Sequence, residues 1–191
     1  MPRLVADVVP AGALRDQPQP RLDANGGLTL RPWARTDVDA LTAAYSDRSI
    51  QQWHHRSMTS DEAARWISDA GARWRAETDA EWAVVASDDT VVGRVALRLI
   101  ALRIGQAQLS YWTLPEHRGA GVATRATTHL ADWALHEVGL WRLEIRHSTR
   151  NPASCRVAIA AGFQLEAELG RSHIHADGWH DVHVHTRFAH D

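Results

Sequence analysis

Hydrophobic and polar residues alternate with two distinct periods along this chain, and the periods mark its secondary structure. Where apolar residues recur at every second position, the pattern indicates half-buried strands. These strands are predicted over residues 28–31, 81–87, 91–103, 106–114 and 140–146. The second and third of them are expected to pair antiparallel through a turn at Asp88-Asp89, and a last hairpin is expected around residues 177–181.

Apolar residues spaced three and four apart predict helices between these strands. They are expected over residues 37–47, 49–54, 59–77, 121–138 and 151–161. Thr59 and Glu62 form a capping box, in which each side chain accepts a bond from an N–H group at the helix start. Asn151-Pro152 is a common helix entry, because Asn caps the first turn and Pro is already in a helical conformation.

Residues 1–26 contain four prolines and a turn sequence at 23–26, which predict an extended or partly ordered arm. Residues 27–191 are expected to form a single domain. The chain has 191 residues, of which 45% are hydrophobic, enough to bury a proper core.

Charge and composition exclude several classes of protein. The formal net charge is −2 without a run of basic residues, so nucleic acid is not expected as a direct partner. No apolar run approaches the ~18 residues of a membrane span, and the first residues do not resemble a secretory signal. A single cysteine, Cys155, excludes an internal disulfide. A cytoplasmic protein is expected, with the oligomeric state open and a homodimer as one option.

The stretch from Leu109 to Thr124 carries the strongest chemical signal. An apolar strand is followed by Pro115, a Gly/Ala turn and a long helix, so free N–H groups at the helix start point toward the turn. Gly119 and Gly121 allow a tight turn that a phosphate can approach, and Arg118 adds positive charge. The pattern predicts a cradle for a pyrophosphate.

Two other phosphate-binding loops fit this stretch less well. A P-loop requires Lys followed by Ser or Thr after its last glycine, where this chain has Val122-Ala123. A dinucleotide-binding fingerprint requires a third small residue at the helix and a later acidic residue, and that pattern is incomplete.

The loop resembles the acyl-CoA loop of the GNAT superfamily of N-acetyltransferases, through Arg118, Gly121 and Ala123. The strand at 140–146, the Asn151-x-x-Ser154 motif and the Gly-Phe pair at 162–163 follow in the order found in that superfamily. They resemble in particular the branch of RimJ/RimL-type ribosomal-protein alanine acetyltransferases. The resemblance extends over residues 27–188.

The resemblance implies an α+β fold, in which helices flank a mostly antiparallel mixed sheet of about seven strands that is splayed at the acyl-CoA site. It also implies transfer of an acetyl group from acetyl-CoA to a primary amine, by direct attack in a ternary complex without a metal. The acceptor would be a protein or peptide N-terminus or a small-molecule amine. The alternative is a non-catalytic acyl-CoA-binding sensor or assembly protein.

Two departures from the superfamily are consistent with that alternative. The tyrosine that serves as general acid in many members is replaced by Ala158, as fits the RimJ/RimL-like branch. The start of the strand before the loop, residues 106–110, lacks the glutamate that relatives often carry. The base could therefore be His54, His55, Glu81, or a water held by Ser110 and the backbone.

The resemblance assigns roles to individual residues. Coenzyme binding is expected at Trp112, Thr113, Leu114, Arg118, Gly119, Ala120, Gly121, Val122, Ala123, Thr124, Asn151 and Ser154. Two of these are also expected to be catalytic. A backbone N–H near Trp112, at a bulge within 111–113, would polarise the thioester, and Ser154 would lie beside the thiol. The acceptor amine is expected to contact Trp53, His54 and Ser110.

Twelve histidines and nine tryptophans raise further hypotheses. A hairpin turn at Asp177-Gly178 would place His175 opposite His180, leaving His173, His175 and His180 on one face and His183 and His185 on the other. Exposed strand histidines are favoured over a metal site, and Cys155 is interpreted as an inert thiol. Core positions are expected for Trp33, Trp66, Trp74, Trp82, Trp112, Trp133 and Trp141.

Overall fold

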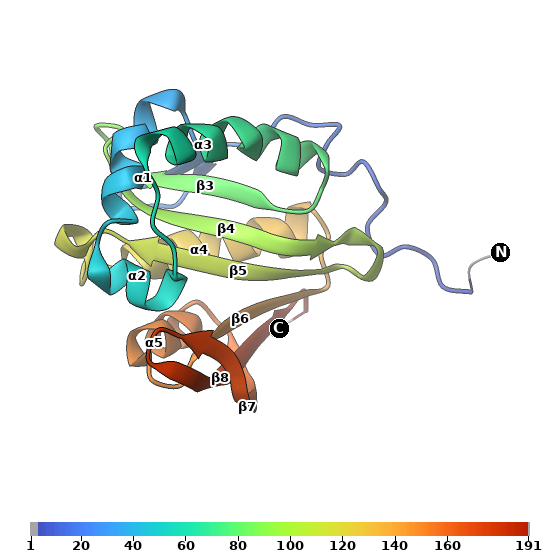
Figure 1. Cartoon of the computed structure of the whole chain (residues 1–191). Coiled ribbons are helices and arrows are strands. Elements are labelled where there is room, and N and C mark those ends of the chain that lie inside the picture. The colour runs from blue at the N-terminus through green and yellow to red at the C-terminus, as the bar shows by residue number, and fades with distance from the viewer. Residues whose placement is uncertain (1–3, 191) are drawn as a thin grey trace.

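The computed structural model describes residues 4–190, which fold around one open sheet of eight strands (Figure 1). The strands are β1 (Leu22–Asp23), β2 (Thr29–Pro32), β3 (Ala80–Val85), β4 (Val91–Ala101), β5 (Gln106–Thr113), β6 (Arg142–Ser148), β7 (Gln164–His175) and β8 (Gly178–Phe188). Their order in the sheet is β1-β2-β3-β4-β5-β6-β8-β7. Only the β5–β6 pair is parallel, so the expected mixed, mostly antiparallel sheet is confirmed.

The helices lie close to the predicted stretches. They are α1 (Val38–Ala44), α2 (Arg48–His54), α3 (Ser60–Arg75), α4 (Val122–Asp132) and α5 (Pro152–Ala160). Single turns flank them at η1 (Arg35–Asp37), η2 (Leu102–Ile104) and η3 (Pro115–His117), and α4 continues as a π-helical turn, η4 (Trp133–Glu137). The capping box starts α3 as predicted, with Thr59 and Glu62 bonded reciprocally. None of the helices within residues 4–190 is long and apolar enough to cross a membrane.

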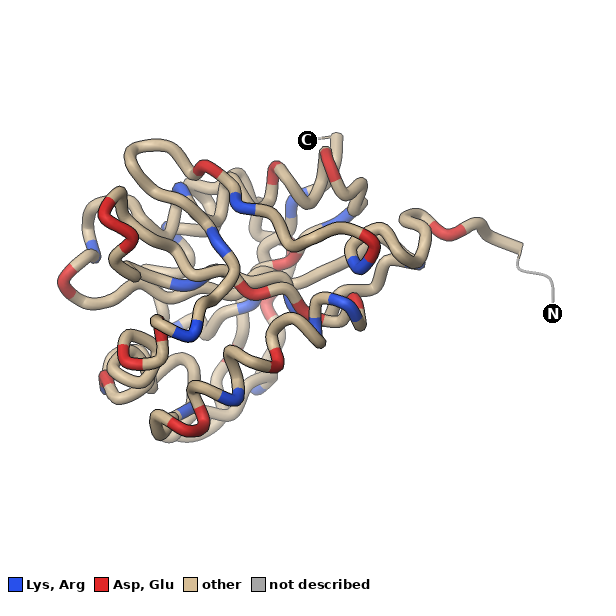
Figure 2. The backbone as a smooth tube through the Cα atoms, turned by 90° about the horizontal axis from the view of Figure 1, so that it is seen from above, with Lys and Arg blue, Asp and Glu red and all other residues tan. Residues whose placement is uncertain are grey.

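The two faces of the sheet bury separate hydrophobic clusters because side chains alternate along each strand. Leu41, Ile50 and Ile67, on α1, α2 and α3, pack with Trp112 of β5 on one face. Leu130 of α4 packs against Leu109, Leu143 and Ile145 on the other face, and α4 crosses behind the sheet in Figure 1. Acidic and basic residues are interspersed over the molecule (Figure 2).

Strands β5 and β6 separate part-way along their length. Their parallel pairing runs from Gln106↔Arg142 to Leu109↔Ile145 and then stops, although β5 continues to Thr113 and β6 to Ser148. The expected bulge at 111–113 is absent, because the β4–β5 register is regular from Thr113 to Gln108. The irregularity lies instead between Arg98 and Ala101. The splay therefore results from the end of the β5–β6 ladder.

The segment before β2 packs on the domain. Val9 and Leu14 are buried, and the Glu77 carboxylate accepts N–H bonds from Gly12, Leu14 and Arg15. β1 adds an eighth strand to the sheet, beyond the expected seven. Residues 1–3 of the expected arm lie outside the described residues.

The tryptophans follow the predicted core pattern with one exception. Trp74, Trp82 and Trp133 form an aromatic cluster with ring centroids 5.5–6.3 Å apart, while Trp33 and Trp112 are buried and Trp66 packs edge-on against Trp33. The prediction was wrong for Trp141, which is 46% exposed. β6 begins only at Arg142, so Trp141 precedes the ladder and escapes the alternation that buries Leu143.

Candidate functional site

The stretch predicted to be an anion cradle lies at the end of β5. The chain leaves the strand through η3, turns at exposed residues 118–121 and enters α4. Gly119 and Gly121 have φ of 79° and 74°, values that side chains other than glycine rarely adopt. Gly121 is the N-cap of α4 and no side chain caps this helix, so its first N–H groups stay available to an anion.

Two arginines flank this turn. Arg118 Nε donates to Thr113 O at 3.2 Å, and Arg125 Nη1 donates to Ala120 O at 2.9 Å. Arg125 Nε is buried without a hydrogen-bond partner among residues 4–190. Sequence reasoning missed Arg125, although its position four residues after Gly121 places it one helical turn above the loop.

The gap beside β5 exposes backbone groups of particular residues. The N–H of Leu114 donates to Val92 O on β4, and N–H directions alternate along a strand. The N–H of Trp112 therefore faces β4, whereas those of Tyr111 and Thr113 face the gap. The sequence had placed Trp112 among the catalytic residues, and strand geometry favours its two neighbours. The Trp112 indole instead packs in the core, 3.4 Å from the Tyr45 hydroxyl.

Ser154 and Tyr111 meet at the far side of this gap. The Ser154 Oγ lies 2.8 Å from the Tyr111 hydroxyl, which also contacts Ser154 O at 3.1 Å. Burial raises the pKa of Tyr111, so its phenol stays protonated at neutral pH. Asn151 accepts the N–H of Ser154 at 3.0 Å and caps α5.

Sequence reasoning also missed the phenol of Tyr111. The tyrosine position expected on α5 is occupied by Ala158, which is fully buried. Tyr111 supplies a phenol to the first turn of α5, at Ser154, from a different element, β5. A search for a tyrosine within the α5 sequence could not have found it.

A buried ion pair lies on the opposite face of the sheet. Arg94 of β4 contacts Glu81 of β3 at 2.6 Å and 2.7 Å, and both side chains are almost fully buried. Arg94 Nη1 also donates to Ser110 Oγ at 3.1 Å. The Arg94 guanidinium therefore holds both the Glu81 carboxylate and the Ser110 hydroxyl in place.

His54 lies between this ion pair and the gap. Burial, together with the positive charge of Arg94, lowers the pKa of His54 to about 3. Its Nε2 is 3.0 Å from Tyr111 O, so the neutral ring donates to that carbonyl. His54 is therefore a positioned neutral group and a weak base.

The end of α2 contacts the tip of the β7–β8 hairpin. His55 Nε2 lies 2.7 Å from His175 Nδ1, and the Trp53 ring packs edge-on at 5.6 Å from the His175 ring. Trp53 is half-buried there, beside His54.

The histidine-rich hairpin differs from the predicted register. His175 pairs with Gly178 and His173 pairs with His180, so the turn is one residue earlier than expected. This moves the pairing by two residues, which leaves every side chain on its predicted face. His175 stacks on His180 at 4.1 Å, and both are buried, as is His185, so the expectation of exposed strand histidines was wrong for these three. On the other face, His185 Nε2 is 3.7 Å from Sγ of Cys155, the thiol interpreted from the sequence as inert.

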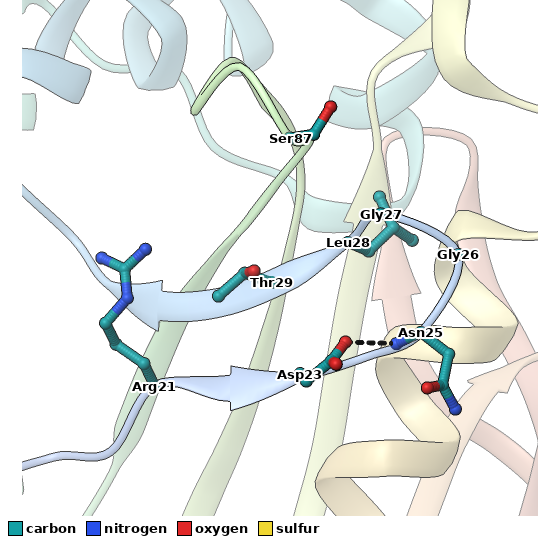
Figure 3. Close-up of a pocket in the computed structure, with 8 residues that line it drawn as sticks. All are labelled: Arg21, Asp23, Asn25, Gly26, Gly27, Leu28, Thr29 and Ser87. Atoms are coloured by element: carbon teal, nitrogen blue, oxygen red, sulfur yellow. Dashed lines mark hydrogen bonds between the residues drawn. The ribbon is translucent and has the colours of Figure 1, made fainter.

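A separate shallow depression follows the β1–β2 hairpin (Figure 3). It is lined by Arg21, Asp23, Asn25, Gly26, Gly27, Leu28, Thr29 and Ser87. None of these residues belongs to the cradle, the gap or the Tyr111–Ser154 contact.

Comparison with known proteins agrees with this geometry. The family model of the acetyltransferase (GNAT) domain matches residues 27–164. The chain belongs to the GNAT acetyltransferase family. It is 36% identical over 101 residues to the probable N-acetyltransferase YjcK of Bacillus subtilis, which is 52% of this chain and 55% of that protein. It is 27% identical over 104 residues to the ribosomal-protein-serine acetyltransferase of Escherichia coli, covering 54% of this chain and 58% of that protein. The matches thus span little more than half of these two relatives.

Solved structures share the GNAT fold. RimL, the ribosomal L7/L12 alpha-N-protein acetyltransferase, in complex with coenzyme A, superposes with a TM-score of 0.82 at 18% identity, covering 88% of this chain and 98% of that one. An acetyltransferase from Salmonella typhimurium that modifies the N-terminal serine of L7/L12 superposes with a TM-score of 0.80 at 18% identity, covering 88% of this chain and 99% of that one. At these identities the superpositions show the shared fold, and the RimJ/RimL-like branch expected from the sequence is supported by the similarity to the ribosomal-protein-serine acetyltransferase.

Proposed function

We propose that this GNAT protein transfers the acetyl group of acetyl-CoA to a primary amine by direct attack. The observation that carries the proposal is the joint presence of an uncapped helix start at Gly121 and the gap that opens between β5 and β6. A pyrophosphate would accept N–H bonds from residues 119–124, with Arg118 and Arg125 beside it. The pantetheine arm would bond the gap-facing N–H groups of Tyr111 and Thr113 as an added strand.

The chemistry follows from the groups at the gap. The amine nitrogen bonds to the thioester carbon, a gap-facing N–H of β5 stabilises the oxyanion, and the carbon–sulfur bond then breaks. The leaving thiolate takes a proton from the Ser154 hydroxyl, which is replenished from the Tyr111 phenol 2.8 Å away. The attacking amine loses one proton to solvent as the amide forms, and a proton from solvent restores the Tyr111 phenol. Burial keeps that phenol protonated until the thiolate forms.

The contacts of the candidate bases restrict the acceptor, and His55 lies 2.7 Å from His175 Nδ1. Glu81 is paired with Arg94, and the pKa of His54 is lowered to about 3. The amine must then be substantially neutral before it binds. At pH 7.5, about a third of an α-amine is neutral, against about a thousandth of an alkyl amine such as a lysine side chain. We infer a peptide or protein N-terminus, or a small amine of similarly low pKa, as acceptor.

Trp53, His54 and Ser110 would contact this acceptor. They lie on or beside the face of β5 that α2 covers, and Trp53 provides an aromatic wall. The reaction would take place in the cytoplasm, the location expected from the sequence.

The experiment measures release of free CoA thiol from acetyl-CoA with N-terminal peptides and with spermidine. Ser154→Ala and Tyr111→Phe should each lower kcat about tenfold or more and leave CoA affinity unchanged, because both hydroxyls act in the transition state. Tyr45→Phe and Ser46→Ala make the same chemical changes away from the gap and should leave kcat unaltered. Equal turnover of all four variants would contradict the proposed roles.

The alternative, a non-catalytic acyl-CoA sensor, predicts a different result in the same assay. It predicts CoA binding measurable by calorimetry with no turnover of any amine tested. Failure of CoA to bind would contradict both functions.

A further inference from the structure

Four potential metal ligands converge under α5, on the face of the sheet opposite Arg94. They are His147 of β6, His183 and His185 of β8, and Cys155 of α5. One donor atom from each lies within 4.8 Å of the other three. His147 is 6% exposed and His185 is completely buried.

The sheet register produces this convergence. His147 pairs directly with His183 across the β6–β8 ladder, and His185 lies two residues further along β8 on the same face. Helix α5 covers this face and brings Cys155 Sγ to 3.7 Å from His185 Nε2. Two ligands of a tetrahedral zinc ion, one nitrogen and one sulfur, are about 3.6 Å apart.

Two of the imidazoles are already oriented as metal ligands. His147 bonds Ser148 O through Nδ1 at 2.8 Å, and its Nε2 is buried with no hydrogen-bond partner among residues 4–190. His183 bonds Glu168 through Nε2 at 3.2 Å, and its buried Nδ1 likewise has no partner within that range. An outer carbonyl or carboxylate that holds one ring nitrogen, while the other faces inward, is the usual support of a metal-bound histidine.

The ring positions agree with a shared ion. The ring centroid of His147 lies 5.1 Å from that of His185 and 5.5 Å from that of His183, and the centroids of His183 and His185 are 6.0 Å apart. Imidazoles on one tetrahedral ion place their centroids about 5 Å apart. Small side-chain movements would therefore bring all four donors to bonding distance.

We propose that His147, Cys155, His183 and His185 form a binding site for a divalent zinc ion. Four protein ligands close the coordination shell, so the ion would be structural and would fasten α5 to β6 and β8. Because Cys155 follows Ser154 directly, the ion would also hold Ser154 against Tyr111. The competing interpretation is a buried histidine–thiol cluster that functions without metal.

The test uses the full chain, stripped of metal with a chelator and titrated with Zn²⁺ or Co²⁺ in the absence of acetyl-CoA. We expect one ion per chain, an intense visible cobalt spectrum typical of tetrahedral coordination, and a near-ultraviolet thiolate-to-cobalt band. Zinc at a hundredfold excess over its Kd should raise Tm by about 5–10 °C.

Variants then identify the ligands. Cys155→Ser should remove the thiolate band, and His185→Gln should weaken zinc binding at least tenfold. His173→Gln, on the opposite face of the same hairpin, is the matched control and should bind zinc like the unaltered protein.

Three results would overturn the proposal: no stoichiometric binding, a cobalt spectrum of the unaltered protein without a sulfur band, or equal loss of binding in the His173→Gln control. The first two require no variant, so they decide the question even if a substitution prevents folding. Neither depends on turnover, so failure of the zinc site is distinguishable from failure of the proposed activity.

Discussion

The buried Arg94–Glu81 pair allows a quantitative test of how the acceptor face of the sheet is built. Glu81→Gln leaves the Arg94 guanidinium without its counter-charge, and Arg94→Met leaves the Glu81 carboxylate buried and unpaired. The two side chains are only 4% and 6% exposed, so water cannot replace the lost partner. Each single substitution should therefore cost about 3–5 kcal/mol of unfolding free energy.

The double variant Glu81→Leu/Arg94→Met should be much less unstable than the sum of the singles. It removes both charges and fills the site with apolar side chains, an exchange that is often neutral or stabilising. In Arg94→Met and in the double variant, the Ser110 hydroxyl also loses the hydrogen bond that the Arg94 guanidinium donates to it. This loss should cost about 1 kcal/mol of unfolding free energy.

Urea denaturation followed by far-ultraviolet circular dichroism measures these values. With a slope of about 2 kcal/mol per molar urea, the single variants should unfold at about 1.5–2.5 M less urea. Arg98→Met is the control, because Arg98 lies on the same strand and its pair with Asp79 is half-exposed, at 3.5 Å. That change should cost less than about 1 kcal/mol. The reasoning would be refuted if each single variant lost no more unfolding free energy than this control, or if the loss in the double variant equalled the sum of the two single losses.

Three further predictions concern the cradle, pH and the acceptor. Gly121→Asp should weaken CoA binding at least tenfold in calorimetry, because it adds negative charge at the anion site. Gly121→Asn, which tolerates the same φ of 74°, should retain most of the affinity. Equal CoA affinities of the two variants would contradict the cradle. Burial lowers the pKa of His54 to about 3, so as pH falls the unfolded chain takes up a proton before the folded chain does, and the free energy of unfolding should drop between pH 6.5 and 3. His54→Gln should reduce the slope of this drop, measured by urea titrations, by up to about 1.4 kcal/mol per pH unit. An unchanged slope would contradict the lowered pKa of His54. Trp53→Ala should raise the acceptor's KM far more than the KM of acetyl-CoA, and preference for spermidine over N-terminal peptides in steady-state assays would contradict the inferred acceptor.

Features governed by neighbouring residues could be predicted from the sequence. The capping box at Thr59 and Glu62, the helix entry at Asn151 and the glycine turn before α4 all formed as expected. Each depends on hydrogen bonds and dihedral preferences within a few residues, which local sequence contains in full. The order of the elements followed from these local signals and from hydrophobic periodicity. The family followed from the resemblance of the loop at Arg118, Gly121 and Ala123 and of the Asn151-x-x-Ser154 motif to the GNAT superfamily.

The candidate site depended on contacts between residues far apart in the chain. Periodicity identified β5 and β6 as strands, but only the register shows that their pairing ends at Leu109 and Ile145 and leaves a gap. The Tyr111–Ser154 contact joins residues 43 apart, across strand and helix, and no local pattern specifies it.

The histidines show the same division between sequence and tertiary structure. Side-chain alternation correctly separated His173, His175 and His180 from His183 and His185, because that assignment needs only the parity of positions along a hairpin. That His147 and Cys155 complete the second group was decided by the pairing of β6 with β8 and by the docking of α5. Packing of distant elements is the balance of many weak interactions over the whole core, so only the folded chain determines which side chains meet.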